Sequence, residues 1–223
     1  SFHGTECSME QGHQEIKSER TLLAALLLSA PGPIVTGIAA ITSHSTTQMA
    51  DFVRRTAELV ASFMSWWVYR KLRRDASIDG AGRERLERLA KLSVGGAMTC
   101  SGAALFIIGL LRMFIYKPSG NVTMGLVIAI LGLLTNSWFW VRYTALSREQ
   151  GSPVLAAQRT LYRAKAFVDF CVVSALFAVA IAPTHPATRY VDALGSVIVS
   201  IYLLWNGLNM VRQNKARLIS VAR

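Results

Sequence analysis

Six ionisable side chains interrupt two segments of this sequence that are otherwise rich in apolar residues. They are Asp51, Arg54, Arg55, Glu58, Lys165 and Asp169. Residues three or four positions apart share one face of a helix. Asp51 can therefore reach Arg54 or Arg55, Arg54 can reach Glu58, and Lys165 can reach Asp169. Carboxylates held close together in apolar surroundings are suited to binding a cation. The cluster is therefore the first candidate for a ligand or ion site.

The elements that would carry this cluster are six long apolar segments. They cover 21–42, 48–69, 89–116, 122–143, 154–182 and 190–211. The chain is 52% hydrophobic and 17% charged, whereas a soluble domain has about 25% charged residues. A spanning helix needs about 20 mostly apolar residues, and helices satisfy every backbone group in lipid. We therefore predict an all-α, polytopic membrane protein with a bundle of six transmembrane helices, the first kinked by the PGP sequence at 31–33.

The position of the cluster inside two of these spans supports two interpretations. A charge deep in a bilayer costs about 2.5–3.5 kcal/mol unless it is paired or hydrated, and such residues usually mark a functional site. However, the three acids and three bases sum to zero charge, so the cluster can also be a self-neutralised network that only fixes helix packing. Arg55 and Arg163 can in addition extend their charged groups toward a membrane surface.

Basic residues predict the orientation of the chain. The loops after the second and fourth spans and the C-terminal tail are rich in Lys and Arg, whereas the other loops hold at most one each. Basic loops stay in the cytoplasm, so we predict a multi-pass protein of the plasma membrane (the bacterial inner membrane) with both termini cytoplasmic. These loops also explain the net charge of +11 by contact with anionic lipid. The bilayer, and no nucleic acid, is the predicted partner.

The polar ends of the chain flank the membrane domain. We predict a flexible cytoplasmic segment over 1–20, a transmembrane domain over 21–211 and a short cytoplasmic tail over 212–223. The first segment contains His3, Cys7 and His13, residue types that could bind zinc or copper, but their spacing fits no compact motif and favours a solvated tail. No nucleophile–base pair and no phosphate-binding glycine loop is apparent, so we predict no enzyme and no certain cofactor.

Five motifs resemble those of the cation diffusion facilitator family, in the family's order. The sequence STTQMAD at 45–51 resembles the entry to the second helix of the family, and GAGRERLE at 80–87 resembles the segment before the third. Asn136 falls on the family's Asn in the fourth helix. SPVL at 152–155 resembles the start of the fifth helix, and DALGS at 192–196 resembles the start of the sixth. The resemblance covers all six spans.

The resemblance implies a six-helix bundle, a homodimer, and exchange of a divalent metal cation for protons that drives efflux. It also implies two ligand pairs of the type HxxxD or DxxxD on helices two and five. Aligned on the motifs, the first pair becomes Arg54 and Glu58, and the second becomes Leu161 and Lys165. An alignment from the sixth span instead makes Lys165 and Asp169 the second pair. Arginine keeps its proton in proteins and cannot bind a metal, so the substrate site is altered.

Two functions follow from this departure. The first is proton-coupled cation efflux, in which Asp51, Glu58 and Asp169 supply negative charge and Lys165 is a built-in cation or a proton-coupled switch. The second is a transport-inactive relative with a structural or partner-binding role. We expect Asn136 to make an interhelical hydrogen bond. We expect no cytoplasmic C-terminal domain of the kind that family members usually carry, so dimerisation would depend on the membrane helices.

Overall fold

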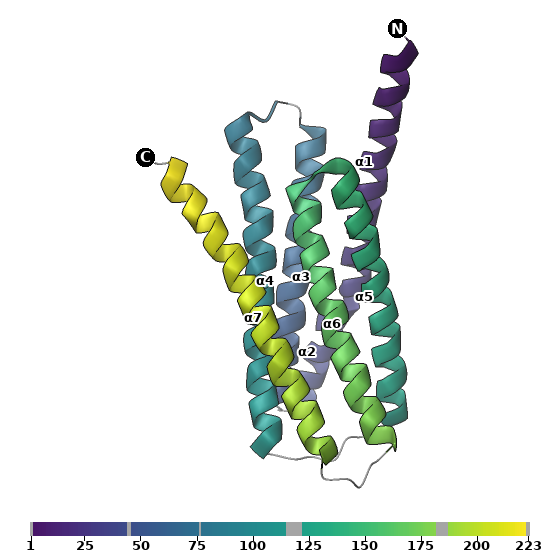
Figure 1. Cartoon of the computed structure of the whole chain (residues 1–223), viewed down its shortest axis with the longest axis vertical. Coiled ribbons are helices and arrows are strands. Elements are labelled where there is room, and N and C mark those ends of the chain that lie inside the picture. Colours follow the sequence, from purple (N-terminus) through teal and green to yellow (C-terminus); the bar gives the residue numbers. More distant parts are fainter. Residues whose placement is uncertain (1, 44–45, 76, 115–121, 182–186, 222–223) are drawn as a thin grey trace.

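The computed structural model of the chain is a bundle of helices (Figure 1). It describes residues 2–43, 46–75, 77–114, 122–181 and 187–221. Seven helices account for almost all of them, and no strand occurs in this part of the chain. The helices are α1 (Phe2–Ser29), α2 (Pro31–Ser43), α3 (Thr46–Arg74), α4 (Gly80–Phe114), α5 (Val122–Gln150), α6 (Pro153–Ile181) and α7 (Ala187–Val221).

The break between α1 and α2 falls where the PGP sequence predicted a kink. The last turn of α1 closes with a hydrogen bond from the Ala30 amide to the Leu26 carbonyl, 3.0 Å long. Pro31 then begins α2, because proline has no amide hydrogen to continue the ladder of α1 but fits the first position of a new helix. The helix α2 continues in the direction of α1, away from the end of the bundle where α1 begins, so the two helices together make one crossing (Figure 1).

The N-terminal segment is helical in the structure, and the flexibility predicted for 1–20 stays a prediction. The helix α1 extends back to Phe2 and is continuous with the first apolar span. The segment contains no proline and several Glu and Gln residues, which lose little side-chain freedom in a helix. The side chains of His3, Cys7 and His13 lie outside the described residues, so the metal-binding role considered for them stays a prediction.

The path of the chain through the bundle is that of a multi-pass membrane protein. Both termini lie at one end, together with the α3–α4 and α5–α6 connections (Figure 1). With α1 and α2 counted as one crossing, the seven helices cross the bundle six times. Within the described part of the chain, four stretches are long and apolar enough to span a membrane, namely Glu15–Ile38, Gly80–Leu111, Leu126–Gln150 and Leu194–Asn214. The structure and this composition confirm the predicted all-α membrane bundle.

The helices α3 and α6, which carry the charged cluster, are not among these four stretches. Small residues bring both helices close to α4. A core of buried residues includes Ala61 of α3, Ala97 of α4, and Ala157 and Ala164 of α6. Small side chains allow membrane helices to approach closely. Glu58 and Arg54 of α3 and Lys165 of α6 are thereby held inside the bundle.

The helices α4 and α7 pack along each other at two glycines. A Cβ added at Gly207 would lie 2.7 Å from the Thr99 amide nitrogen and 2.8 Å from the Gly95 carbonyl oxygen. A Cβ at Gly102 would lie 2.9 Å from the Leu204 amide nitrogen. Because these neighbours are backbone atoms, they cannot rotate away as a side chain could. Only glycine fits at these two positions without moving one helix away from the other.

We expect a Gly207→Ala substitution to destabilise the protein by about 1–3 kcal/mol, because it overpacks the contact between α4 and α7. The matched control is Gly96→Ala in α4, where an added Cβ meets nothing within 4 Å. This control should be neutral or stabilising by up to about 1 kcal/mol, since alanine favours helix more than glycine does. Thermal unfolding of both variants in detergent measures the difference. Equal melting temperatures would contradict the close contact.

Candidate functional site

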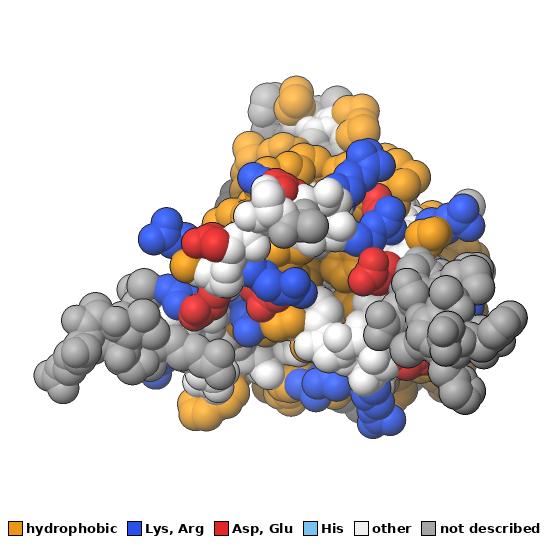
Figure 2. All heavy atoms as spheres, turned by 90° about the horizontal axis from the view of Figure 1, so that it is seen from above, with side chains coloured by type: hydrophobic (Ala, Val, Ile, Leu, Met, Phe, Trp, Pro, Cys, Tyr) orange, Lys and Arg blue, Asp and Glu red, His pale blue; other side chains and the backbone are white. Residues whose placement is uncertain are grey.

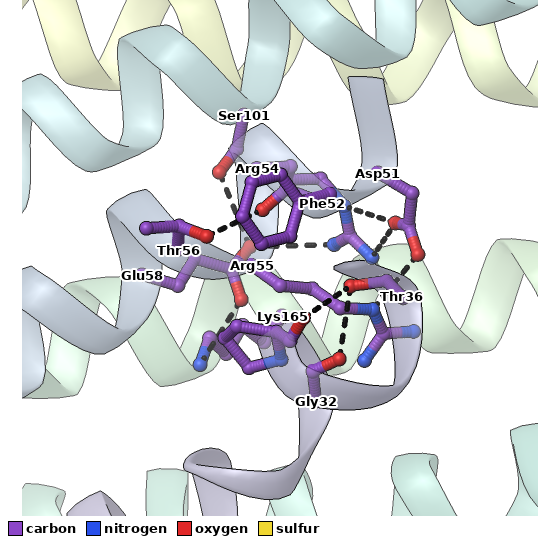
Figure 3. A network of polar contacts seen from close by, with 11 residues as sticks. Gly32, Thr36, Asp51, Phe52, Arg54, Arg55, Thr56, Glu58, Ser101 and Lys165 are labelled. Carbon is purple, nitrogen blue, oxygen red and sulfur yellow. Dashed lines mark hydrogen bonds and ion pairs between the residues drawn. The ribbon is translucent and has the colours of Figure 1, made fainter. Parts of the chain in front are cut away.

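Glu58 is the centre of the charged cluster. It lies on α3, 12 residues after Thr46 and 16 before Arg74, so it is about 18 Å and 24 Å from the two ends of the helix. One carboxylate oxygen, Oε1, accepts hydrogen bonds from Arg54 Nη1 at 3.3 Å and from Ser101 Oγ at 3.1 Å. The other, Oε2, lies 3.2 Å from Lys165 Nζ. Three helices, α3, α4 and α6, thus meet at a single carboxylate (Figure 3).

Arg54 joins Glu58 to a second carboxylate on the same helix. Its Nε and Nη2 atoms donate to Asp51 Oδ1 at 3.0 Å and 2.8 Å. The other oxygen of Asp51, Oδ2, accepts from Arg55 Nε at 2.8 Å. These contacts at spacings of three and four residues are those that the sequence predicted. Gly32 lies beside Arg55, since a Cβ there would be 3.3 Å from Arg55 Nη1, so the start of α2 borders this end of the network.

Exposure of the network increases from its centre toward the end of the bundle opposite the termini. The Glu58 side chain is 12% exposed, Arg54 16%, Asp51 25% and Arg55 42%. The Lys165 side chain, which approaches from α6, is 11% exposed. The Glu58–Lys165 pair is therefore the buried end of a row of alternating charges, and Asp51 and Arg55 form its more exposed end.

Lys165 makes a different pair from the one predicted. Helix spacing allowed a Lys165–Asp169 ion pair, but the Lys165 ammonium is directed across to Glu58 of α3, and no ion pair with Asp169 forms among the described residues. The ammonium also lies 4.8 Å from the centre of the Tyr162 ring, at a distance typical of a cation–π interaction. Lys165 thus links two helices and does not form a pair along one.

Asp169 takes its hydrogen bond from α5. Asn136 Nδ2 donates to Asp169 Oδ2 at 2.6 Å, which is the kind of interhelical hydrogen bond predicted for Asn136. Gly132, one turn earlier on α5, leaves space for the carboxylate, since a Cβ there would lie 3.4 Å from Asp169 Oδ2. Among the described residues, no Lys or Arg forms an ion pair with Asp169. The Asp169 carboxylate thus lies beside the network without an ion-pair partner among the described residues.

Leu161 is the other candidate for the pair on α6, which corresponds to the fifth helix of the family. It is 2% exposed and packs in the core between α3, α4 and α6. Its aliphatic side chain offers no ligand atom. Both alignments of helix five place Lys165 in the pair, and the structure places its ammonium 3.2 Å from Glu58. A basic group therefore occupies the interior next to Glu58 whichever alignment is chosen.

Two buried polar side chains at or near the charged cluster were not predicted from the sequence. Ser101 of α4 is 2% exposed and donates to Glu58. Gln158 of α6 is 1% exposed and donates from Nε2 to Ser65 Oγ of α3 at 2.7 Å. Serine is frequent in membrane helices, so Ser101 and Ser65 gave no signal. Gln158 did offer one, because an amide inside an apolar span needs an interhelical partner.

The chemistry of the site is electrostatic. The groups joined in ion pairs are two carboxylates (Asp51 and Glu58) and three cations (Arg54, Arg55 and Lys165), which sum to +1, while Asp169 adds −1. No group of three or more His, Cys, Asp or Glu residues that could hold a metal occurs in the described part of the chain. A dication at Glu58 would be repelled by two neighbouring cations in a medium of low dielectric constant.

Comparison with known families decides the class of the protein. The sequence model of one protein family, described as the cation efflux transmembrane domain, matches residues 22–219. The chain belongs to the cation efflux family. No curated protein matches the sequence. Members of the cation efflux family are transporters and not enzymes in general, and the multi-pass helical bundle agrees with such a role. In this cation efflux protein, Arg54 of α3 and Lys165 of α6, the residues that the sequence alignment predicted at ligand positions of the family, both contact Glu58.

Proposed function

We propose that this protein exports a cation in exchange for protons through an altered site at Glu58 and Asp169. The observation that carries the proposal is the double pairing of the Glu58 carboxylate with Arg54 at 3.3 Å and with Lys165 at 3.2 Å. Buried ionisable residues in membrane proteins line ion pathways. Lys165 acts as a tethered cation, which occupies the carboxylate until a substrate cation displaces it.

The charge of the cluster favours a cation of low charge. Among Arg54, Arg55 and Lys165, only Lys165 can release a proton, because arginine stays protonated in proteins. The whole cluster, with Asp169, is neutral while Lys165 is charged, and release of one proton leaves it at −1. One monovalent cation restores neutrality, whereas a divalent cation would leave a net positive charge. We therefore infer one-for-one exchange of a proton and a monovalent cation.

The positions of the basic residues support the orientation of the protein. Lys and Arg side chains gather on the end of the bundle that carries both termini (Figure 2). Basic segments stay on the cytoplasmic side, so we propose that this end faces the cytoplasm of a bacterial inner membrane and that the Asp51–Arg55 end of the network faces outward. We also propose the homodimer that the family resemblance implies, formed through the membrane helices.

Flux into proteoliposomes tests the proposal. The reconstituted full chain is given sodium, potassium, zinc or manganese in turn, while a dye reports the internal pH. We expect monovalent cations to move together with protons in the opposite direction, and divalent metals to move less. The control is the double variant Glu58→Ala, Lys165→Ala. Wild-type flux no greater than that of this variant for every cation would overturn the proposal.

A second candidate function is supported by the short contacts of the network. Asp51 binds both Arg54 and Arg55 at 2.8 Å, and salt bridges of this kind can simply fix helix packing. In that case the protein is a transport-inactive member with a structural or partner-binding role. This candidate predicts that cations and pH leave the conformation unchanged. Cation-dependent changes in proteolysis or in thermal unfolding that depend on Glu58 would exclude it.

A further inference from the structure

A row of polar groups continues along α3 from Glu58 toward the end of the bundle that carries both termini. Its members lie three or four residues apart and therefore on one face of the helix. They are Glu58, Ser62, Ser65, Tyr69 and Arg73. Ser62 and Ser65 are 2% and 0% exposed, and Tyr69 is 8% exposed. This face is directed into the bundle, where polar groups require partners.

The helix α6 faces this row in antiparallel register. Glu58 lies opposite Lys165, and seven residues further along each helix Ser65 lies opposite Gln158, whose Nε2 donates to Ser65 Oγ at 2.7 Å. Seven residues correspond to about 10 Å of helix. The Ser65–Gln158 level therefore lies about two turns nearer the termini than the Glu58–Lys165 pair.

The row ends in a hydrogen-bonded chain between helices. Tyr69 donates to Gln150 Oε1 at 2.7 Å, and Gln150 Nε2 donates to Ser18 Oγ at 2.7 Å. Glu19 then binds Arg73 at 2.6 Å. Gln150 is the last residue of α5, so this chain lies at the end of the bundle near the termini (Figure 1). A polar side chain thus recurs at each turn of α3 from Glu58 to that end.

Three buried polar atoms along this distance have no hydrogen-bond partner among the described residues. They are Trp66 Nε1, Gln158 Oε1 and the Tyr162 hydroxyl. The Gln158 and Tyr162 side chains are each 1% exposed, and Trp66 is partly buried against the hydrophobic core cluster to which Tyr162 belongs. Gln158 and Tyr162 are four residues apart and share one face of α6. Leaving one such group unsatisfied costs about 1–3 kcal/mol, and ordered water commonly satisfies buried polar groups that find no partner in the protein.

We propose that ordered water between α3 and α6 binds Trp66, Gln158 and Tyr162 and connects the Glu58–Lys165 pair to the end of the bundle that carries both termini. Buried water typically makes two to four hydrogen bonds to polar groups that would otherwise be unsatisfied. Trp66 and Tyr162 can each donate, and Gln158 Oε1 can accept. The role of this water as the proton route for Lys165 depends on the proposed function, but its presence does not.

Hydroxyl-radical footprinting of the reconstituted full chain tests the proposal, because radicals made from bound water oxidise the side chains beside it. Tyr162 and Tyr143 are a matched pair. Both are at most 1% exposed and belong to the same aromatic cluster, but the Tyr143 hydroxyl has a partner in the Thr21 carbonyl at 3.4 Å. We expect Tyr162 to be oxidised at least about threefold faster than Tyr143, because only its hydroxyl requires water.

A Gln158→Leu variant should bring the rate at Tyr162 down to that at Tyr143, because leucine offers no group to hold the water. The comparison in the wild-type chain stands even where that variant does not fold. Equal rates at Tyr162 and Tyr143 in the wild-type chain would overturn the proposal, whatever the flux measurements give. Fast oxidation of Tyr162 together with absent cation flux would leave the water site in place and count against the transport function alone.

Discussion

A Glu58→Ala variant is expected to lose transport and about 3–5 kcal/mol of stability. The substitution removes the acceptor shared by Arg54, Ser101 and Lys165. Arg54 and Lys165, whose side chains are 16% and 11% exposed, then lie inside the bundle without the carboxylate that they shared. Removing one partner of a buried ion pair has a cost of this size. Thermal unfolding in detergent and flux in proteoliposomes measure the two effects.

The matched control is Glu84→Ala. Glu84 also forms an ion pair with an arginine four residues away, Arg88, at 3.0 Å. The Glu84 side chain, however, is 56% exposed. Exposed pairs of this kind contribute about 0–1 kcal/mol, so this variant should unfold close to the wild type and retain flux. If the two variants were equally stable, Glu58 would not be the acceptor that holds α3, α4 and α6 together.

The second large effect is expected from Lys165→Met. Methionine keeps the length of the side chain and removes the tethered cation, while Glu58 keeps Arg54 and Ser101 as partners. The cluster then carries −1, and a cation from solution can take the place of the ammonium. A bound cation stabilises the fold by about 2.7 kcal/mol at a concentration one hundred times its dissociation constant. We expect added sodium or potassium to raise the melting temperature of this variant much more than that of the wild type.

The control for this experiment is Arg163→Met, two residues away on α6. Arg163 is exposed, so its loss changes the charge of the protein equally without opening the site. A cation-dependent rise in melting temperature that is the same in both variants would reflect general screening. In that case Lys165 does not stand in for a substrate.

The fold and the contacts within one helix followed from the sequence. Six long apolar segments predicted the crossings, and the PGP sequence predicted the interruption between α1 and α2. The contacts of Arg54 with Asp51 and Glu58 were predicted from their spacing, because helix geometry alone brings such residues together. Local rules were sufficient wherever the partners lie on the same helix.

The contacts between helices did not follow in the same way. Spacing allowed Lys165 to bind Asp169, but the rotation of α6 about its axis decides which acid it meets. That rotation is set by packing of small residues such as Ala157 and Ala164 against α3 and α4, which turns Lys165 toward Glu58. Ser101 was missed for the same reason, since a serine in an apolar helix does not reveal which helix it will face.

A density map of the full chain in lipid, prepared with a saturating concentration of thallium(I), tests the site most directly. Thallium(I) scatters strongly and substitutes for potassium. If Lys165 acts as a tethered cation, thallium density lies between Glu58 and Asp169, and Lys165 Nζ is displaced from its position 3.2 Å from Glu58. A map with no cation there and with Lys165 still bound to Glu58 would contradict it.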